Sequence, residues 1–371
     1  MSSPEALLLE RRDRLVKTIR LEKTDRTPVI LMADTFMART LGLKAAELCK
    51  GVDASSTIMS EGAAAIGGLD GVNGAFASAP FFPLQFMTRI QLPGRDLAED
   101  SVWQLDEREL MTHEDYDTIL DKGWNAFFGP YVRDRLGIDL PALMQDTAKA
   151  PQALEKFHSK GLLVYQKLVA ITVNESLSGG RSMPKFMRDL FTMPDKVEAV
   201  LDLILKDSLD LLGRQMQGSP NPSPVVSISP ARGASEFFSP RLWERFVFKY
   251  IKAVVDFITE RGYICNIHCD SNWERDLDYF REFKPGTVVF ESDAGTKMSK
   301  IREKLGDRLA IKGDVPANLM VLGTPEQVHA YCRELIEASD GRGLILGCGC
   351  SCPQNAKLEN VRAMISAATG Q

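Results

Sequence analysis

The stretch SPRLWERFVFKYIKAVVDFITERGYICNIHCD, residues 239–270, passes from a helical pattern into a strand pattern. Its first part repeats apolar residues every three or four positions, with Ser239 as N-cap and Gly262 as stop signal, which predicts a helix over 240–261. The run 263–268 that follows predicts a buried strand. A helix leading into a buried strand is the repeating element of a parallel α/β sheet.

The same alternation extends in both directions from this stretch. We predict further strands near 168–173, 224–229, 287–291, 308–312 and 343–347, and two more near the N-terminus, over 27–32 and 68–73. Eight parallel strands with intervening helices predict a (β/α)8 TIM barrel, an α/β fold that typically needs about 250 residues. The remaining length allows an N-terminal helical extension, residues 1–25, and insertions, within a single domain over residues 1–371.

Composition and charge narrow the classes of function. The 371 residues are 44% hydrophobic and 26% charged, as expected for a globular protein with a large core. A net charge of −5 without a basic block argues against nucleic acid or a membrane surface as partner. The N-terminal residues lack the apolar core of a signal peptide, so we expect a cytoplasmic protein. In that reducing compartment, the seven cysteines are expected to bind metal or react rather than form disulfides.

Two groups of potential metal ligands end predicted strands about eighty residues apart: His268 to Asp270, and the three cysteines of segment 348–352. Alternation along the strand places His268 and Asp270 at the barrel mouth. Because zinc accepts nitrogen, oxygen and sulfur donors, we predict a zinc site at His268, Asp270 and Cys350. The same residues also suit an ordinary core. Three cysteines stay as alternative ligands: Cys269, Cys348 and Cys352.

Other predicted strands also end in polar residues. Among them, Asp293 and Asp314 are our candidates for catalytic residues, although either can simply cap the next helix. The segment 76–97 is rich in aromatic residues and broken by prolines, which is typical of a pocket wall or of a satellite core. We predict that Phe82 and Met87 in this segment contact the substrate.

Four motifs carry a family resemblance. They are Lys312-Gly-Asp-Val-Pro316, Leu-Gly-Thr-Pro-Glu-Gln-Val (322–328), Gly-Cys-Ser-Cys-Pro (349–353) and Glu359-Asn-Val-Arg-Ala363. Together they resemble the C-terminal half of the uroporphyrinogen decarboxylase superfamily. They are most similar to its cobalamin-dependent methyltransferase branch, whose members use a His-x-Cys pair and a later Gly-Cys as zinc ligands. The resemblance covers most of residues 100–370.

The resemblance implies His268, Asp270 and Cys350 as zinc ligands, with aspartate in place of the family's middle cysteine. Either Asp270 or a shifted Cys269 would then complete the site, and an oxygen donor would leave zinc a stronger Lewis acid than a second thiolate. Uroporphyrinogen decarboxylases hold their substrate through an arginine-rich N-terminal stretch, but residues 32–39 contain a single arginine. We expect Met32 and Phe36 in this stretch to contact a less acidic substrate.

These features predict a zinc-dependent methyltransferase. It would move a methyl group between a small molecule and the cobalt of a corrinoid (cobalamin) that a separate protein carries. The aromatic segment 76–97 favours an aryl methyl ether as the methyl donor. Three alternatives stay open: a methylcobamide:thiol methyltransferase, a uroporphyrinogen decarboxylase, and a metal-binding barrel without catalytic activity.

Overall fold

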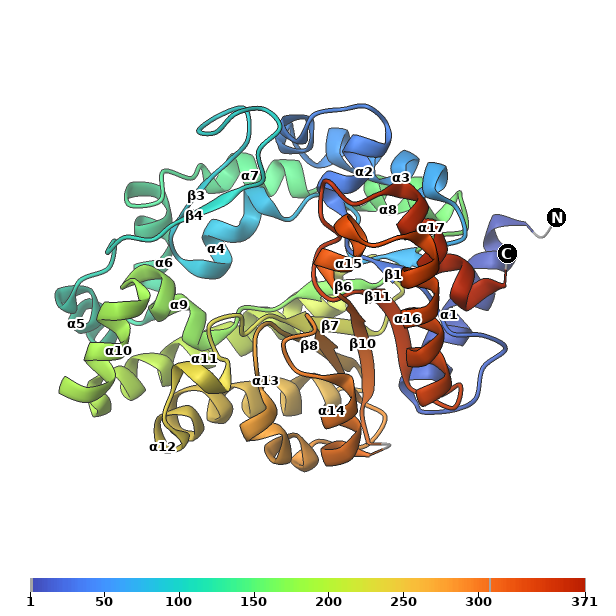
Figure 1. The fold of residues 1–371 in the computed structure, drawn as a ribbon. Coiled ribbons are helices and arrows are strands. Elements are labelled where there is room, and N and C mark those ends of the chain that lie inside the picture. The colour runs from blue at the N-terminus through green and yellow to red at the C-terminus, as the bar shows by residue number, and fades with distance from the viewer. Residues whose placement is uncertain (1–2, 307, 371) are drawn as a thin grey trace.

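The computed structural model describes residues 3–306 and 308–370. Parallel strands form the centre, and most helices lie outside them (Figure 1). The central strands are β1 (Ile30–Leu31), β2 (Gly71–Val72), β5 (Leu163–Val164), β6 (Gln166–Val169), β7 (Val225–Ile228), β8 (Ile264–Cys269), β9 (Val288–Ser292), β10 (Ala310–Val315) and β11 (Leu344–Cys348). The helices are α1 (Pro4–Ile19), α2 (Asp34–Thr40), α3 (Val52–Ile66), α4 (Phe82–Phe86), α5 (His113–Lys122), α6 (Trp124–Asp134), α7 (Leu140–Thr147), α8 (Ala150–His158), α9 (Val173–Gly180), α10 (Met183–Thr192), α11 (Pro194–Gly218), α12 (Pro240–Trp243), α13 (Lys249–Glu260), α14 (Met298–Leu305), α15 (Ala317–Leu322), α16 (Pro325–Ala338) and α17 (Leu358–Thr369).

The strands form two hydrogen-bonded parallel sheets, β1-β2-β5 and β6-β7-β8-β9-β10-β11. Two links join them. Val29, just before β1, pairs with Leu346 of β11, and a single residue, Tyr165, separates β5 from β6. Eight strand positions therefore follow one another in a ring, with β5 and β6 sharing one position. This is the arrangement of a (β/α)8 barrel and confirms the predicted fold class.

The predicted strands after residue 220 each overlap an observed strand, and the predicted helix 240–261 is formed by α12, a π-helical turn (Glu244–Phe248) and α13. The predicted strand 168–173 is partly wrong, because the chain leaves the sheet after Val169 and begins α9 at Val173. Thr172 there accepts a hydrogen bond from the Ser229 backbone (3.1 Å). Tertiary contacts thus outweigh the β-propensity of this branched segment.

Helix α1 closes the amino end of the barrel. Its Leu15 and Ile19 pack against inward-facing strand residues, which come from nearly every position in the ring: Ile30, Leu163, Tyr165, Val225, Ile264, Val289, Ala310 and Ile345. Buried Asp70 nearby pairs with Arg14 and Arg26, at 2.7 Å each. The carboxyl end of the strands therefore remains as the end where a site can form.

The segment between β2 and α5 adds a wall beside that carboxyl end. It contains α4 and an antiparallel hairpin, β3 (Arg89–Gln91) and β4 (Gln104–Asp106), which arch opposite the barrel strands in Figure 1. Phe86, Ile90 and Leu92 form its own small core, flanked by Phe82 and Trp103. None of the helices in the described part of the chain is both long and apolar enough to cross a membrane.

Candidate metal centre

Three predicted ligands meet at the carboxyl end of the barrel. The Nε2 atom of His268 lies 3.2 Å from Asp270 Oδ1 and 3.6 Å from Cys350 Sγ. One ligand atom from each of the three residues fits within 4.8 Å of the others. The side chains of His268 and Asp270 are 12% and 30% exposed, so the cluster is partly open to a ligand.

Strand alternation positions His268. Ile264 of β8 packs in the barrel interior, and Asn266 and His268 share its side of the strand. Cys269 packs on the opposite side, in the core between sheet and helices. Among the described residues, the group of ligand atoms that could hold a metal ion here comes from His268, Asp270 and Cys350 and does not include Cys269.

Close backbone packing positions Cys350. A Cβ on Gly349 would come within 2.7 Å of the Asp293 backbone, so only glycine fits at this point of the loop. The Gly349 amide donates to Val315 (3.1 Å), and the Cys352 amide donates to Met32 (2.7 Å). The loop after β11 is thereby fixed between β10 and β1. Its exposed member, Cys350, reaches His268, whereas Cys348 and Cys352 are buried in the adjacent core.

A network of charged side chains lies beside His268, next to its Nδ1 atom. His268, Glu291 and Lys312 occupy paired positions on β8, β9 and β10. Glu291 Oε2 lies 3.4 Å from His268 Nδ1, and Lys312 donates a hydrogen bond to Glu291 Oε1. Burial opposes ionisation of Glu291, but Lys312 and His268 hold its pKa well below the usual range. Burial likewise disfavours protonated His268, and Glu291, Asp270 and Cys350 nevertheless raise its pKa.

Two further side chains complete this network. The Asn266 amide donates to Glu291 Oε2 (2.6 Å) and accepts from the Tyr165 hydroxyl (3.0 Å). A carboxylate beside the second nitrogen of a metal-binding histidine commonly fixes its orientation and raises its basicity. Glu291, Lys312 and Asn266 were not among the site residues predicted from the sequence. The alternation that placed His268 in the interior could have identified Asn266, two residues earlier on the same face.

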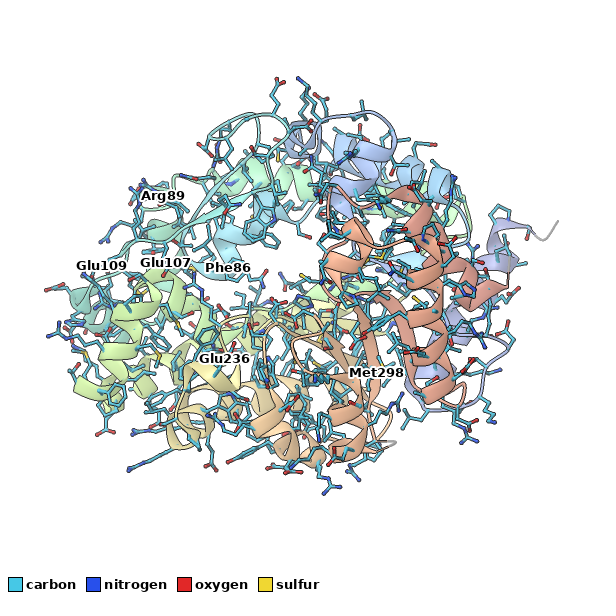
Figure 2. The ribbon with its side chains drawn as sticks, viewed as in Figure 1. Phe86, Arg89, Glu107, Glu109, Glu236 and Met298 are labelled. Carbon is cyan, nitrogen blue, oxygen red and sulfur yellow. The ribbon has the colours of Figure 1, made fainter. Side chains whose placement is uncertain are left out.

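A cavity of about 960 Å³ lies over the cluster. His268, Asp270, Glu291 and Cys350 contribute to its wall. Apolar side chains of the segment after β2 form much of the remainder, including Phe76, Phe81, Phe82, Phe86 and Trp103. Figure 2 shows Phe86 on this side of the opening, while Glu236 lies on the barrel side. A cavity of this size and character accommodates a small aromatic molecule.

The structure separates the other predicted site residues. Met32 and Phe82 line the cavity, whereas Phe36 and Met87 do not and are buried in the core. Asp293 and Asp314 also lie outside the cavity wall. Asp293 accepts the backbone amides of Ser271 (2.9 Å) and Gly295 (2.7 Å), and Asp314 accepts the Tyr331 hydroxyl (2.9 Å). The Asp293 carboxylate therefore holds two loop segments together, and the Asp314 carboxylate ties β10 to α16.

The fold and the cluster define a (β/α)8 barrel with imidazole, carboxylate and thiol donors at its mouth, a donor set that suits zinc. The family model of uroporphyrinogen decarboxylase (URO-D) matches residues 170–371, more than half of the chain. The chain therefore belongs to the uroporphyrinogen decarboxylase family, which confirms the predicted resemblance.

A solved structure shares the fold over nearly the whole length. It is a methyltransferase from Methanosarcina mazei, with a TM-score of 0.71, 15% sequence identity, and coverage of 96% of this chain and 97% of that one. At this identity the likeness concerns the fold alone. No curated protein matches the chain.

Proposed function

We propose that this chain is a zinc-dependent methyltransferase. It moves a methyl group between a small molecule, preferably an aryl methyl ether, and the cobalt of a corrinoid carried by a separate protein. The observation that carries this proposal is the convergence of His268, Asp270 and Cys350 in the wall of a large, mostly apolar cavity. The similar fold of a methyltransferase from M. mazei agrees with it.

The residues of the chain have distinct parts in this proposal. His268 Nε2, an Asp270 oxygen and Cys350 Sγ would hold zinc, and the cavity leaves space for a substrate ligand. Bound zinc supplies a Lewis acid that favours departure of a phenolate oxygen. Glu291 Oε2 lies 3.4 Å from His268 Nδ1, and with zinc on Nε2 its negative charge would favour the proton on Nδ1. The aromatic wall holds the ring of the substrate and excludes water.

The lining of the cavity distinguishes this function from porphyrinogen decarboxylation. Uroporphyrinogen carries many carboxylates, which proteins usually hold with arginine. Among the described residues, no arginine lines the cavity, while Asp34, Asp270 and Glu291 do. These carboxylates would repel such a substrate. The aromatic wall likewise favours an aryl ether over a small aliphatic thiol.

The test combines metal analysis with a transfer assay. We expect the purified protein to contain one zinc per chain and to methylate a reduced corrinoid protein from an aryl methyl ether. His268→Ala and Cys350→Ala should each lower both zinc affinity and the rate of methyl transfer. The loss should exceed the roughly 10–100-fold that is typical when a residue that only supports a metal ligand is removed. Cys352→Ala, next to the cluster but buried, is the matched control and should keep both.

Several outcomes would reject the proposal. Stoichiometric zinc without methyl transfer from ethers or amines, or to thiols, would indicate a metal-binding barrel without this activity. Zinc retained by both ligand variants would reject the site. Decarboxylation of uroporphyrinogen by the metal-free protein would favour the family's namesake reaction.

A further inference from the structure

Two buried polar side chains in the cavity have no hydrogen-bond partner within the protein. Asn73, directly after β2, is 4% exposed, and neither its amide nitrogen nor its amide oxygen is bonded. Ser227 of β7 is 2% exposed, and its hydroxyl is also unpaired. Both residues line the cavity that contains the metal cluster. Leaving such groups unpaired costs roughly 1–3 kcal/mol each, so a partner is expected in the working protein.

Strand geometry gives both side chains a defined place. Val225 faces the barrel interior, so Ser227, two residues later, shares that face. Val72 packs outward against the helices, so its neighbour Asn73 turns inward. Ser227 pairs with Asn266, two residues before His268, which places the backbones of Ser227 and His268 about 8 Å apart by standard strand spacing.

The charges around these groups narrow the chemistry of the ligand. One lysine, Lys167, is among the described residues that line the cavity. Its ammonium group donates hydrogen bonds to the carbonyl oxygens of Asn221 (2.5 Å) and Ser219 (3.4 Å). The lining carboxylates disfavour an anion. An amide and a hydroxyl both donate and accept, and they match a neutral group that also does both.

We propose that Asn73 and Ser227, together the recognition site, are the polar contacts in this cavity for uncharged hydroxyl groups of the substrate. The inference rests on the proposed function only in taking an aryl methyl ether as the frame of that substrate. The substrate class is therefore a hydroxylated aryl methyl ether, and aryl ethers bearing a carboxylate are excluded.

Binding of three probes tests this site without corrinoid or turnover. The probes are 3-methoxyphenol, anisole and 3-methoxybenzoate, each titrated calorimetrically into the zinc-loaded and the zinc-free protein. We expect 3-methoxyphenol to bind at least tenfold more tightly than either other probe in both forms. In Asn73→Leu and Ser227→Ala, its advantage over anisole should fall to threefold or less. Phe82→Leu, which alters the apolar wall, is the control and should weaken 3-methoxyphenol and anisole equally.

The outcomes separate this inference from the proposed function. Selective binding without methyl transfer would support the recognition site and reject the function. Methyl transfer without selective binding of 3-methoxyphenol would support the function and reject the recognition site. Equal affinities for 3-methoxyphenol and anisole, tighter binding of 3-methoxybenzoate, no binding of any probe, or an unchanged preference in both variants would overturn the recognition site.

Discussion

The two sides of the cavity differ in whether their buried polar side chains have hydrogen-bond partners. On β8, β9 and β10, Asn266, Glu291 and Lys312 satisfy one another. On the side formed by β7 and the residue after β2, the side chains of Ser227 and Asn73 line the cavity and are buried without partners among the described residues. The hydrogen bonds among Asn266, Glu291 and Lys312 form without a ligand, whereas His268 Nδ1 beside them has no hydrogen-bond partner among the described residues. The side of Ser227 and Asn73 is incomplete, as suits a surface that a substrate completes.

The same contrast separates two fully buried glutamates. The pKa of Glu291 is held low by Lys312 and His268, whereas burial raises the pKa of Glu175 to about 7. Glu175 lies in the first turn of α9 and accepts the Arg232 backbone amide (2.6 Å). Its charged form is only partly compensated, because the Arg232 side chain approaches no closer than 4.0 Å. The surroundings of Glu291 therefore stabilise its ionised form, whereas burial destabilises the ionised form of Glu175.

Removing the cation of the paired region should have the largest effect on stability. Lys312→Met leaves Glu291 buried beside a single histidine, and we expect it to lower the free energy of unfolding by about 3–5 kcal/mol. Urea denaturation of the metal-free protein measures this loss. Lys300→Met breaks an exposed pair with Glu303 (2.7 Å) and should leave the free energy of unfolding nearly unchanged. Equal losses in both variants would show that the network contributes no more than a surface pair.

Neutralising the uncompensated glutamate should stabilise the protein at high pH. Glu175 has a folded pKa of about 7, above its ordinary value of 4.5, so the wild type loses stability as pH rises between these values. Glu175→Gln keeps the acceptor for Arg232 and removes that loss. Relative to the wild type, the variant should gain about 2–3 kcal/mol above pH 7 and little below pH 4.5. Unfolding measured across this range checks the sign, and a gain that is the same at every pH would contradict it.

The smallest expected effect comes from one substitution made on both sides of the cavity. Asn266→Leu removes the partner of Tyr165 and Glu291 and should cost about 1–3 kcal/mol. Asn73→Leu removes an amide without partners and should be neutral or stabilising by up to about 1 kcal/mol. Thermal and urea unfolding of the pair without ligand gives the comparison. A larger loss at residue 73 than at residue 266 would remove the distinction between the two sides.

The sequence predicted the ring of strands because apolar runs and glycine stops mark each unit locally. It also placed His268 and Cys269 on opposite faces of β8, because alternation depends on residue order alone. The Glu291–Lys312 pair depends on the register between β9 and β10, which a single sequence does not specify. Register and loop packing also decide which strand-end residues reach the cavity.

The residues placed elsewhere show this limit. Asp293 follows β9 as expected, but neighbouring backbone amides occupy its carboxylate. Met87 adopts a left-handed backbone conformation at the end of α4 and packs into the core instead of the cavity. Phe36 lies on the buried face of α2. The composition of segment 76–97 was consistent with either a pocket wall or a satellite core, and the folded segment forms both.

Because helix α1 fills the amino end of the barrel, ligands reach the cavity from the carboxyl end of the strands. Small molecules must come and go at the rim where a bulky corrinoid carrier would also have to sit. In the proposed reaction, the methyl donor would therefore bind before the corrinoid protein. The corrinoid protein would have to dissociate before the demethylated product is released.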